Sequence, residues 1–208
     1  DYLKITSRLE YRDATDETST LAELGMALKL HRDLSMLGRY RLFRDDFKDD
    51  GRRVTSRLLT GLAYRPVAHN RFSALAKFEY KQEEDNTTEF ATDSDSTIAS
   101  LEMIYQLTSA VQVAGKYAGK LVKDQDSNYT DLVAARLRWD VTNRFDVGVG
   151  YRLLQSHDIG SISHGGFAEV GYRVIQNVWM SVGYSFDAFD SDLTGESHTG
   201  KGVYLKLR

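Results

Sequence analysis

The sequence of 208 residues has no cysteine and a single proline. Without thiols the chain has no disulfide framework, no thiolate metal site and no cysteine nucleophile. Proline cannot donate a hydrogen bond to a strand ladder, so a chain built from strands confines it to turns. Pro66 lies in the turn-like stretch from Arg65 to Asn70, which agrees with an all-β fold.

Long hydrophobic runs are also missing. The mean hydropathy is -0.43, and no run reaches the roughly 18 apolar residues that a transmembrane helix needs. A membrane strand needs only about ten residues of alternating character, so the composition is compatible with a membrane β-barrel. The formal net charge of -3 and the acidic segments argue against nucleic-acid binding.

The clearest pattern that is present lies between Phe145 and Asp187. From Phe145 to Leu153, apolar or aromatic residues alternate with charged residues or glycine, which is the period of a strand with two unlike faces. The same alternation returns at 168–174 and at 178–186. Only three residues separate these last two runs, which predicts an antiparallel hairpin.

The same alternation along the whole chain predicts about twelve strands. A motif that starts with an apolar residue and reaches Tyr or Phe six positions later begins at Leu34, Phe72, Val111, Phe145 and Val178. Its period of roughly 33 to 39 residues corresponds to one hairpin with its connections, the module of an up-and-down barrel. No linker divides the chain, so we expect one domain over residues 1–208.

The connections between the expected strands alternate between two kinds. Short turns are expected near Arg32, Val67, Ser109, Asn143 and Gln176. The others are expected to be longer and acidic, as at 45–52 and 82–96. Bacterial outer-membrane barrels have an even strand number, short periplasmic turns and longer external loops.

Alternation alone leaves two orientations open: a soluble β-sandwich or lipocalin-like barrel with its apolar face inside, and a membrane barrel with its apolar face in lipid. Twelve strands enclose a lumen too wide for one row of apolar side chains to fill. The polar face is densely charged, and unpaired charges in a dry core are costly. Aromatic residues of the apolar face gather near the strand ends, as at two membrane interfaces: Tyr11, Tyr64, Phe72, Tyr80, Tyr105, Trp139, Phe145 and Phe186.

These strands, together with the segments Phe167 to Arg173 and Gly202 to Arg208, resemble a bacterial outer-membrane β-barrel of the twelve-stranded size class. The chain is also similar to barrels that terminate long multidomain surface proteins. Closing strands of such barrels usually end on an aromatic residue, whereas this chain stops at Arg208. Because it starts at Asp1 with neither Met nor a signal sequence, we expect a processed product or a piece of a longer chain that continues beyond Arg208.

The resemblance implies the fold class and the surroundings of the chain. The expected fold is all-β, an antiparallel up-and-down transmembrane β-barrel. The expected location is the bacterial outer membrane, with short turns and both termini periplasmic and the long acidic loops external. The expected partners are outer-membrane lipid and lipopolysaccharide, together with further domains of the same chain or an envelope complex.

On this interpretation the charged face lines the lumen. Its cations outnumber its acids, which favours a passive channel, of porin type, for small anionic solutes. The alternative is a lumen closed by its own ion pairs or by a plug, in a barrel that acts as a membrane anchor or translocation barrel of a larger protein. The expected lumen-lining residues are Arg8, Arg39, Arg41, Arg57, Lys77, Glu79, Glu102, Lys116, Arg136, Arg138, Arg152, Glu169 and Arg173.

Other chemistry has little support in the sequence. The acidic segments match no calcium-loop pattern and are interpreted as solvated loops. Adjacent residues on a strand point to opposite faces, so His157-Asp158 and Ser163-His164 cannot pair as catalytic groups. The five histidines show no ligand spacing. We therefore predict no enzyme activity, no catalytic residues, no cofactor and no metal site.

Overall fold

The computed structural model of the chain describes residues 2–47, 51–68, 70–87, 92–124, 127–176, 178–187, 193 and 200–207. Within these residues no helix is long and apolar enough to cross a membrane. The strands are β1 (Leu3–Asp13), β2 (Glu17–His31), β3 (Leu34–Phe47), β4 (Gly51–Tyr64), β5 (Phe72–Asp85), β6 (Thr92–Gln106), β7 (Val111–Lys123), β8 (Ser127–Asp140), β9 (Phe145–Ser156), β10 (Ser161–Ile175), β11 (Val178–Ser185) and β12 (Gly202–Leu207).

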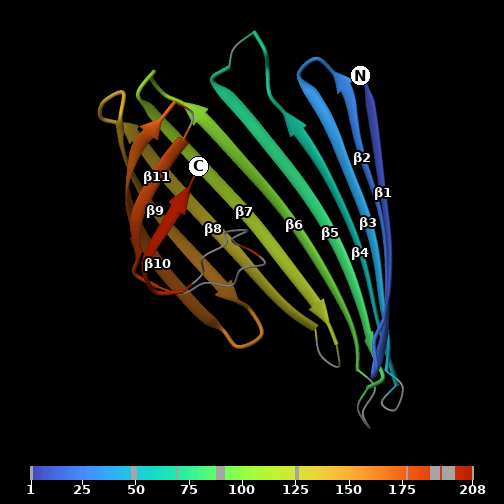
Figure 1. The fold of residues 1–208 in the computed structure, drawn as a ribbon. Helices are drawn as coiled ribbons and strands as arrows, with labels where there is room; N and C mark the ends of the chain where they lie inside the picture. The colour runs from blue at the N-terminus through green and yellow to red at the C-terminus, as the bar shows by residue number, and fades with distance from the viewer. Residues whose placement is uncertain are drawn as a thin grey trace. The chain divides into compact units, whose positions relative to one another are not determined.

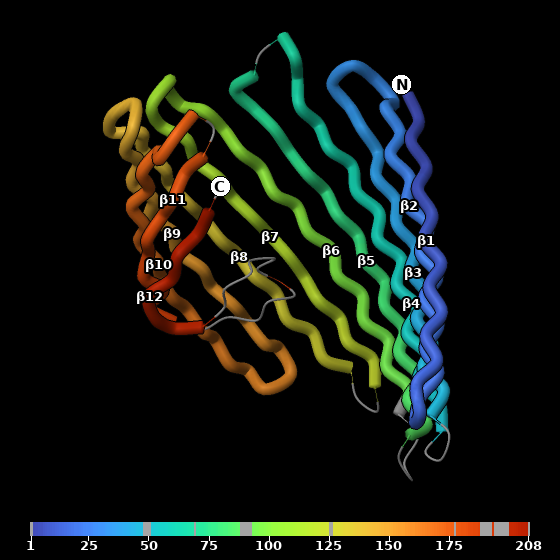
Figure 2. Tube along the Cα trace, viewed as in Figure 1, coloured from blue at the N-terminus to red at the C-terminus, as the bar shows by residue number. Residues whose placement is uncertain are grey.

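The twelve strands form one sheet in which every strand follows its sequence neighbour, from β1 to β12 (Figure 1). Neighbouring strands pair antiparallel, as in β1 with β2 and β9 with β10. The prediction of an all-β, antiparallel, up-and-down fold of about twelve strands is therefore confirmed. Figure 2 follows the same hairpins along the Cα trace.

The residues group into two compact units. The first unit contains 1–67, 75–99 and 120–129, and the second contains 68–74, 100–119 and 130–208. Strands β1 to β4 belong to the first unit and β9 to β12 to the second. The expectation of a single domain over residues 1–208 stays a prediction.

The strands extend further than the sequence analysis predicted. The expected loop 45–52 is largely strand, because Asp45 pairs with Arg53 and Asp46 with Arg52 across β3 and β4. The expected loop 82–96 is likewise shortened by β5, which runs to Asp85, and by β6, which starts at Thr92. These loop boundaries were wrong because backbone hydrogen bonds continue a ladder even where both faces are polar. A long connection remains between β11 and β12.

Burial alternates along residues 145–152 of β9, residues 167–174 of β10 and the whole of β11 in the second unit. Asp146 is 0% exposed and Glu169 3% exposed, whereas Val147 is 37% and Val170 52% exposed. We call the face that carries Asp146 and Glu169 the polar face, and the opposite one the apolar face. The charged side chains are thus covered and the aliphatic ones are open, which is the reverse of a soluble β-sandwich.

Glycines on the polar face give room to large side chains of the next strand. Gly150 pairs with Phe167 and Gly148 with Glu169. A Cβ atom on Gly150 would overlap the Phe167 ring, and one on Gly148 would lie 2.7 Å from Cγ of Glu169. These positions are glycine because the neighbouring side chains occupy the space in which a methyl group would lie.

Gly150→Ala is expected to lower the free energy of unfolding by about 1–3 kcal/mol, because the added methyl group overpacks against Phe167. The matched control is Gly115→Ala in β7, where a Cβ atom would meet nothing within 4 Å. Urea unfolding in detergent micelles, followed by circular dichroism, measures both changes. Equal stability of the two variants would contradict the close packing on Gly150.

Candidate functional site

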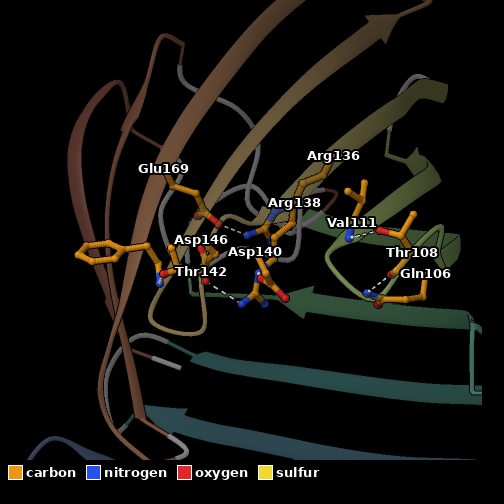
Figure 3. A network of polar contacts seen from close by, with 10 residues as sticks. Gln106, Thr108, Val111, Arg136, Arg138, Asp140, Thr142, Asp146 and Glu169 are labelled. Carbon is orange, nitrogen blue, oxygen red and sulfur yellow. Dashed lines mark hydrogen bonds and ion pairs between the residues drawn. The ribbon is translucent and has the colours of Figure 1, made fainter.

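The candidate site is the polar face of the second unit, which is held by ion pairs between β8 and its neighbours. Nη2 of Arg138 donates to Oδ2 of Asp146 at 2.7 Å, and Asp146 is fully buried. Arg136 forms an ion pair with Glu169, as Figure 3 shows. Asp146 and Glu169 therefore each have an arginine partner, as burial of a charge requires.

The strand register explains how Arg136 reaches Glu169 across an intervening strand. On β9, Gly150 lies opposite Arg136 and Gly148 lies opposite Arg138. Gly148 also lies opposite Glu169 of β10. Because these glycines carry no side chain, Arg136 of β8 can lie over β9 and contact Glu169 of β10.

Two aromatic residues lie among these arginines. The guanidinium of Arg152 lies 4.7 Å from the ring centroid of Phe167, and that of Arg136 lies 5.8 Å from it. Trp179 has Arg138 at 5.4 Å and Arg173 at 6.0 Å. Such cation–π contacts orient the guanidinium groups.

Phe167 and Trp179 belong to the polar face, although the alternation of the sequence did not predict them there. The signal was their position in the strand. Phe167 is two residues before Glu169, and Trp179 is two residues before Ser181, and both of these polar residues are buried. In a strand, residues two apart share a face.

The first unit has its own ladder of ion pairs on the charged face. Arg41 lies 2.6 Å from Glu23, and Arg39 lies 3.7 Å from the same carboxylate. Arg57 lies 2.7 Å from Glu79. These cations are therefore balanced by acids of neighbouring strands.

The other expected lumen residues are placed as follows. Arg8 pairs with Glu10 on β1, where both side chains are more than half exposed. The stem of Lys77 lies against Gly61. Glu102 and Lys116 line a cavity of the second unit. Whether these residues line a lumen stays a prediction.

That cavity has a volume of about 390 Å³ and lies over β6 to β10 and β12. Its charged lining is mostly cationic: Lys116, Arg136, Arg138, Arg152 and Lys206, with Glu102 as the acid. A smaller cavity of about 330 Å³ in the first unit is lined by Arg41, Arg57 and Lys81, with Leu21, Phe43 and Thr55. Both cavities can attract an anion, because nearby cations raise the local potential.

The predicted interface aromatics are mostly open on the apolar face. Phe72 and Tyr80 are half-buried. The other six side chains are exposed by about two-fifths or more, and Tyr11 is the most exposed of them at 69%. They are Tyr11, Tyr64, Tyr105, Trp139, Phe145 and Phe186.

A separate polar cluster lies where β4 and β5 meet their acidic connections. Asp85 accepts hydrogen bonds from the hydroxyl of Thr87 at 2.6 Å and from its backbone N–H at 3.0 Å. Nη2 of Arg53 lies 2.6 Å from the same carboxylate. The Thr87 hydrogen bonds, followed by Arg53, lower the pKa of Asp85 to about 2.

His157 pairs with a residue that the sequence analysis did not consider. Its Nε2 atom lies 2.6 Å from Oδ1 of Asp131, which is near the start of β8. Over the described ranges no group of three or more His, Asp or Glu side chains is arranged to hold a metal ion. The absence of metal, cofactor and catalysis stays a prediction.

No protein-family model matches this chain, and no curated protein matches its sequence. Several solved structures match the fold of this chain at low sequence identity. A KdgM porin in complex with disordered oligogalacturonate is 13% identical, with a TM-score of 0.42, over 86% of this chain and 90% of that chain.

Two further structures span almost the whole chain. The translocator domain of the autotransporter NalP from Neisseria meningitidis is 10% identical, with a TM-score of 0.37, over 100% of this chain and 86% of that chain. OmpT, an outer membrane protein of Vibrio cholerae, is 8% identical, with a TM-score of 0.42, over 99% of this chain and 94% of that chain.

Arg138→Gln is expected to lower the free energy of unfolding by about 3–5 kcal/mol, because it leaves the Asp146 carboxylate buried without its cation. The control Arg8→Gln removes an exposed ion pair and should cost about 0–1 kcal/mol. Urea titration in detergent micelles measures both. The double variant Arg138→Leu with Asp146→Leu should recover most of the loss, and failure to recover it would contradict the pairing.

Asp85 should contribute stability that depends on pH. Because its folded pKa of about 2 lies below the ordinary value of 3.8, the contribution is complete above the ordinary value and is lost as the pH falls toward 2. Asp85→Asn should remove this part of the acid dependence, and Thr87→Val should weaken it. Unfolding curves between neutral and acid pH test this. Identical acid profiles for the wild type and Asp85→Asn would contradict it.

Proposed function

We propose that the chain is an integral outer-membrane β-barrel that acts as a passive channel with a net-basic lumen for small anionic solutes. The observation that carries this proposal is the inverted burial of β9 to β11. Asp146, Arg152 and Glu169 are buried, whereas Val149 and Tyr151 are about half exposed. Such a sheet is stable where lipid covers the aliphatic side chains and the charges face a polar interior.

The length of the apolar face supports the membrane assignment. In β3 the outward side chains are apolar from Leu34 to Leu42, and the same face then carries the ion pair of Arg44 with Asp46, at 2.7 Å. The stretch from Leu34 to Leu42 is close to the roughly 9–11 residues that a tilted strand needs to cross a bilayer. Beyond Arg44 the hairpin of β3 and β4 therefore extends into water.

We further propose the orientation expected from the resemblance. The turns near Arg32 and Gln176, together with both ends of the chain, lie on the periplasmic side. The end of β3 that carries Asp45 and Asp46, the start of β4 and the end of β5 that carries Asp85 face the exterior, next to lipopolysaccharide.

Anion selectivity is supported by the cavity of the second unit, where the lining cations exceed the acids. A low-dielectric wall focuses the field of such charges and raises the local concentration of anions. We propose no catalytic role for any of these groups.

A second function is favoured by the completeness of the ion pairs. Glu23, Glu79, Asp146 and Glu169 each neutralise at least one arginine of the charged face. Side chains that are paired in this way reduce the width of the lumen through which a solute would pass. The alternative is therefore a non-conducting membrane anchor or translocation barrel for further domains of the same chain or an envelope complex.

Planar-bilayer conductance of the refolded 208-residue chain separates the two functions. Under a salt gradient we expect discrete steps whose reversal potential indicates anion preference. Arg39→Glu and Lys206→Glu should shift that potential toward cation preference, because each moves the lumen charge by two.

The matched control is Lys123→Glu, an exposed residue at the end of β7, which should leave the reversal potential nearly unchanged. A folded and inserted barrel that passes no current would overturn the channel and support the anchor.

A further inference from the structure

The lining of the cavity of about 390 Å³ in the second unit contains two chemically different sets of side chains. We call Arg136, Arg138 and Lys206 its cationic side. We call the apolar residues Ile104, Ala114, Leu132 and Phe167, which depart from the polar character of this face, its apolar side. A cavity with an apolar wall and a few convergent polar groups is typical of small-molecule sites, which range from about 300 to 1,000 Å³.

The cationic side is held in place before any ligand arrives. Arg136 is fixed by Glu169 and by the Phe167 ring, and Arg138 by Asp146 and the Trp179 ring. Glu169 itself accepts a hydrogen bond from the Tyr204 hydroxyl at 3.2 Å. Preorganised donors lose little freedom on binding, so more of each contact contributes to affinity.

Donor capacity remains on this side after the internal pairs are made. The Arg136 side chain is 28% exposed, so part of its guanidinium group stays accessible after it pairs with Glu169. An oxygen atom that enters the cavity can accept a charge-assisted hydrogen bond from this accessible part. Lys206, which lines the same cavity, adds a positive charge.

The apolar side determines which kind of anion the cavity prefers. Leu132 is 0% exposed and Phe167 7% exposed, whereas Ile104 and Ala114 are only half-buried. Ile104 and Ala114 therefore form the apolar wall that a ligand can contact. An inorganic anion gains nothing from this wall, whereas an aliphatic chain placed on it is removed from water.

We propose that this cavity binds an organic carboxylate with a short apolar body, whose carboxylate lies at Arg136 and Lys206 and whose body lies on Ile104 and Ala114. This inference rests on the proposed function in one respect, because it takes the polar face to be accessible to solutes. It names the class of anion that the channel would retain.

The test is equilibrium dialysis of radiolabelled hexanoate against the refolded chain in detergent micelles, with protein-free micelles as the blank. Saturable binding with a dissociation constant below about 10 mM is expected. Acetate and inorganic phosphate should compete at least tenfold more weakly, since neither uses the apolar wall. Hexanol, which enters micelles without a charge, should not compete.

Variants assign the binding to this cavity. Arg136→Lys keeps the charge beside Glu169 but removes the planar set of guanidinium donors, and Lys206→Gln removes a charge. Each should weaken hexanoate binding about tenfold, the effect of losing one hydrogen bond to a charged group. Ile104→Ser should lower the affinity for hexanoate to the affinity for acetate. Lys123→Gln, away from the cavity, should leave binding unchanged, and circular dichroism checks that every variant is folded.

The outcomes distinguish this inference from the channel. Absence of saturable hexanoate binding, equal competition by phosphate, or no effect of Arg136→Lys and Lys206→Gln would overturn the carboxylate site, whether or not the barrel conducts. A barrel that binds hexanoate through these residues but passes no current would support the site and overturn the channel alone.

Discussion

The burial of acidic side chains on the polar face constrains the rest of this structure. Asp146 is fully buried and Glu169 nearly so, and a buried carboxylate is tolerated only when a cation and hydrogen bonds compensate its lost hydration. The cations come from β8, and Arg136 reaches Glu169 on β10 because Gly148 and Gly150 of β9 carry no side chains. The charges, the glycines and the strand register therefore depend on one another.

The same constraint accounts for the exposed aliphatic side chains. If one face of a sheet collects the charges in a shared interior, its alternate residues must point the other way. Val147, Val170 and Val182 are therefore open, and they need an apolar solvent rather than a protein core. A membrane supplies that solvent without any further layer of secondary structure.

The ion pairs have two consequences that act in opposite directions. In the proposed channel, an excess of arginine and lysine on the polar face attracts anions. Yet each pair, such as Arg41 with Glu23 or Arg57 with Glu79, occupies space and uses up positive charge. Whether a barrel of this kind conducts or only anchors depends on how much of the cationic surface stays open, and the cavity beside Arg136 is where the second unit leaves it open.

The alternation of residue types determined much by itself, because in a strand it assigns each side chain to one of two faces. It predicted the number and order of the strands and the charged face on which Arg136, Arg138 and Glu169 lie. It did not predict that Asp45 and Asp46 continue β3, because ladder hydrogen bonds need no apolar face. It also overlooked Phe167 and Trp179, since an aromatic residue on a polar face breaks the expected pattern.

Only the tertiary structure decided which charges meet. The sequence offers several arginines for each carboxylate, and a register change of one residue would exchange every face. Pairing of Arg138 with Asp146, and of Arg136 with Glu169 across two glycines, depends on the alignment of β8, β9 and β10. The alternation of residue types is a local property that can be read directly from the sequence. The register of the strands, and the space that glycines leave for side chains of the next strand, are relations between strands that are set when the sheet forms.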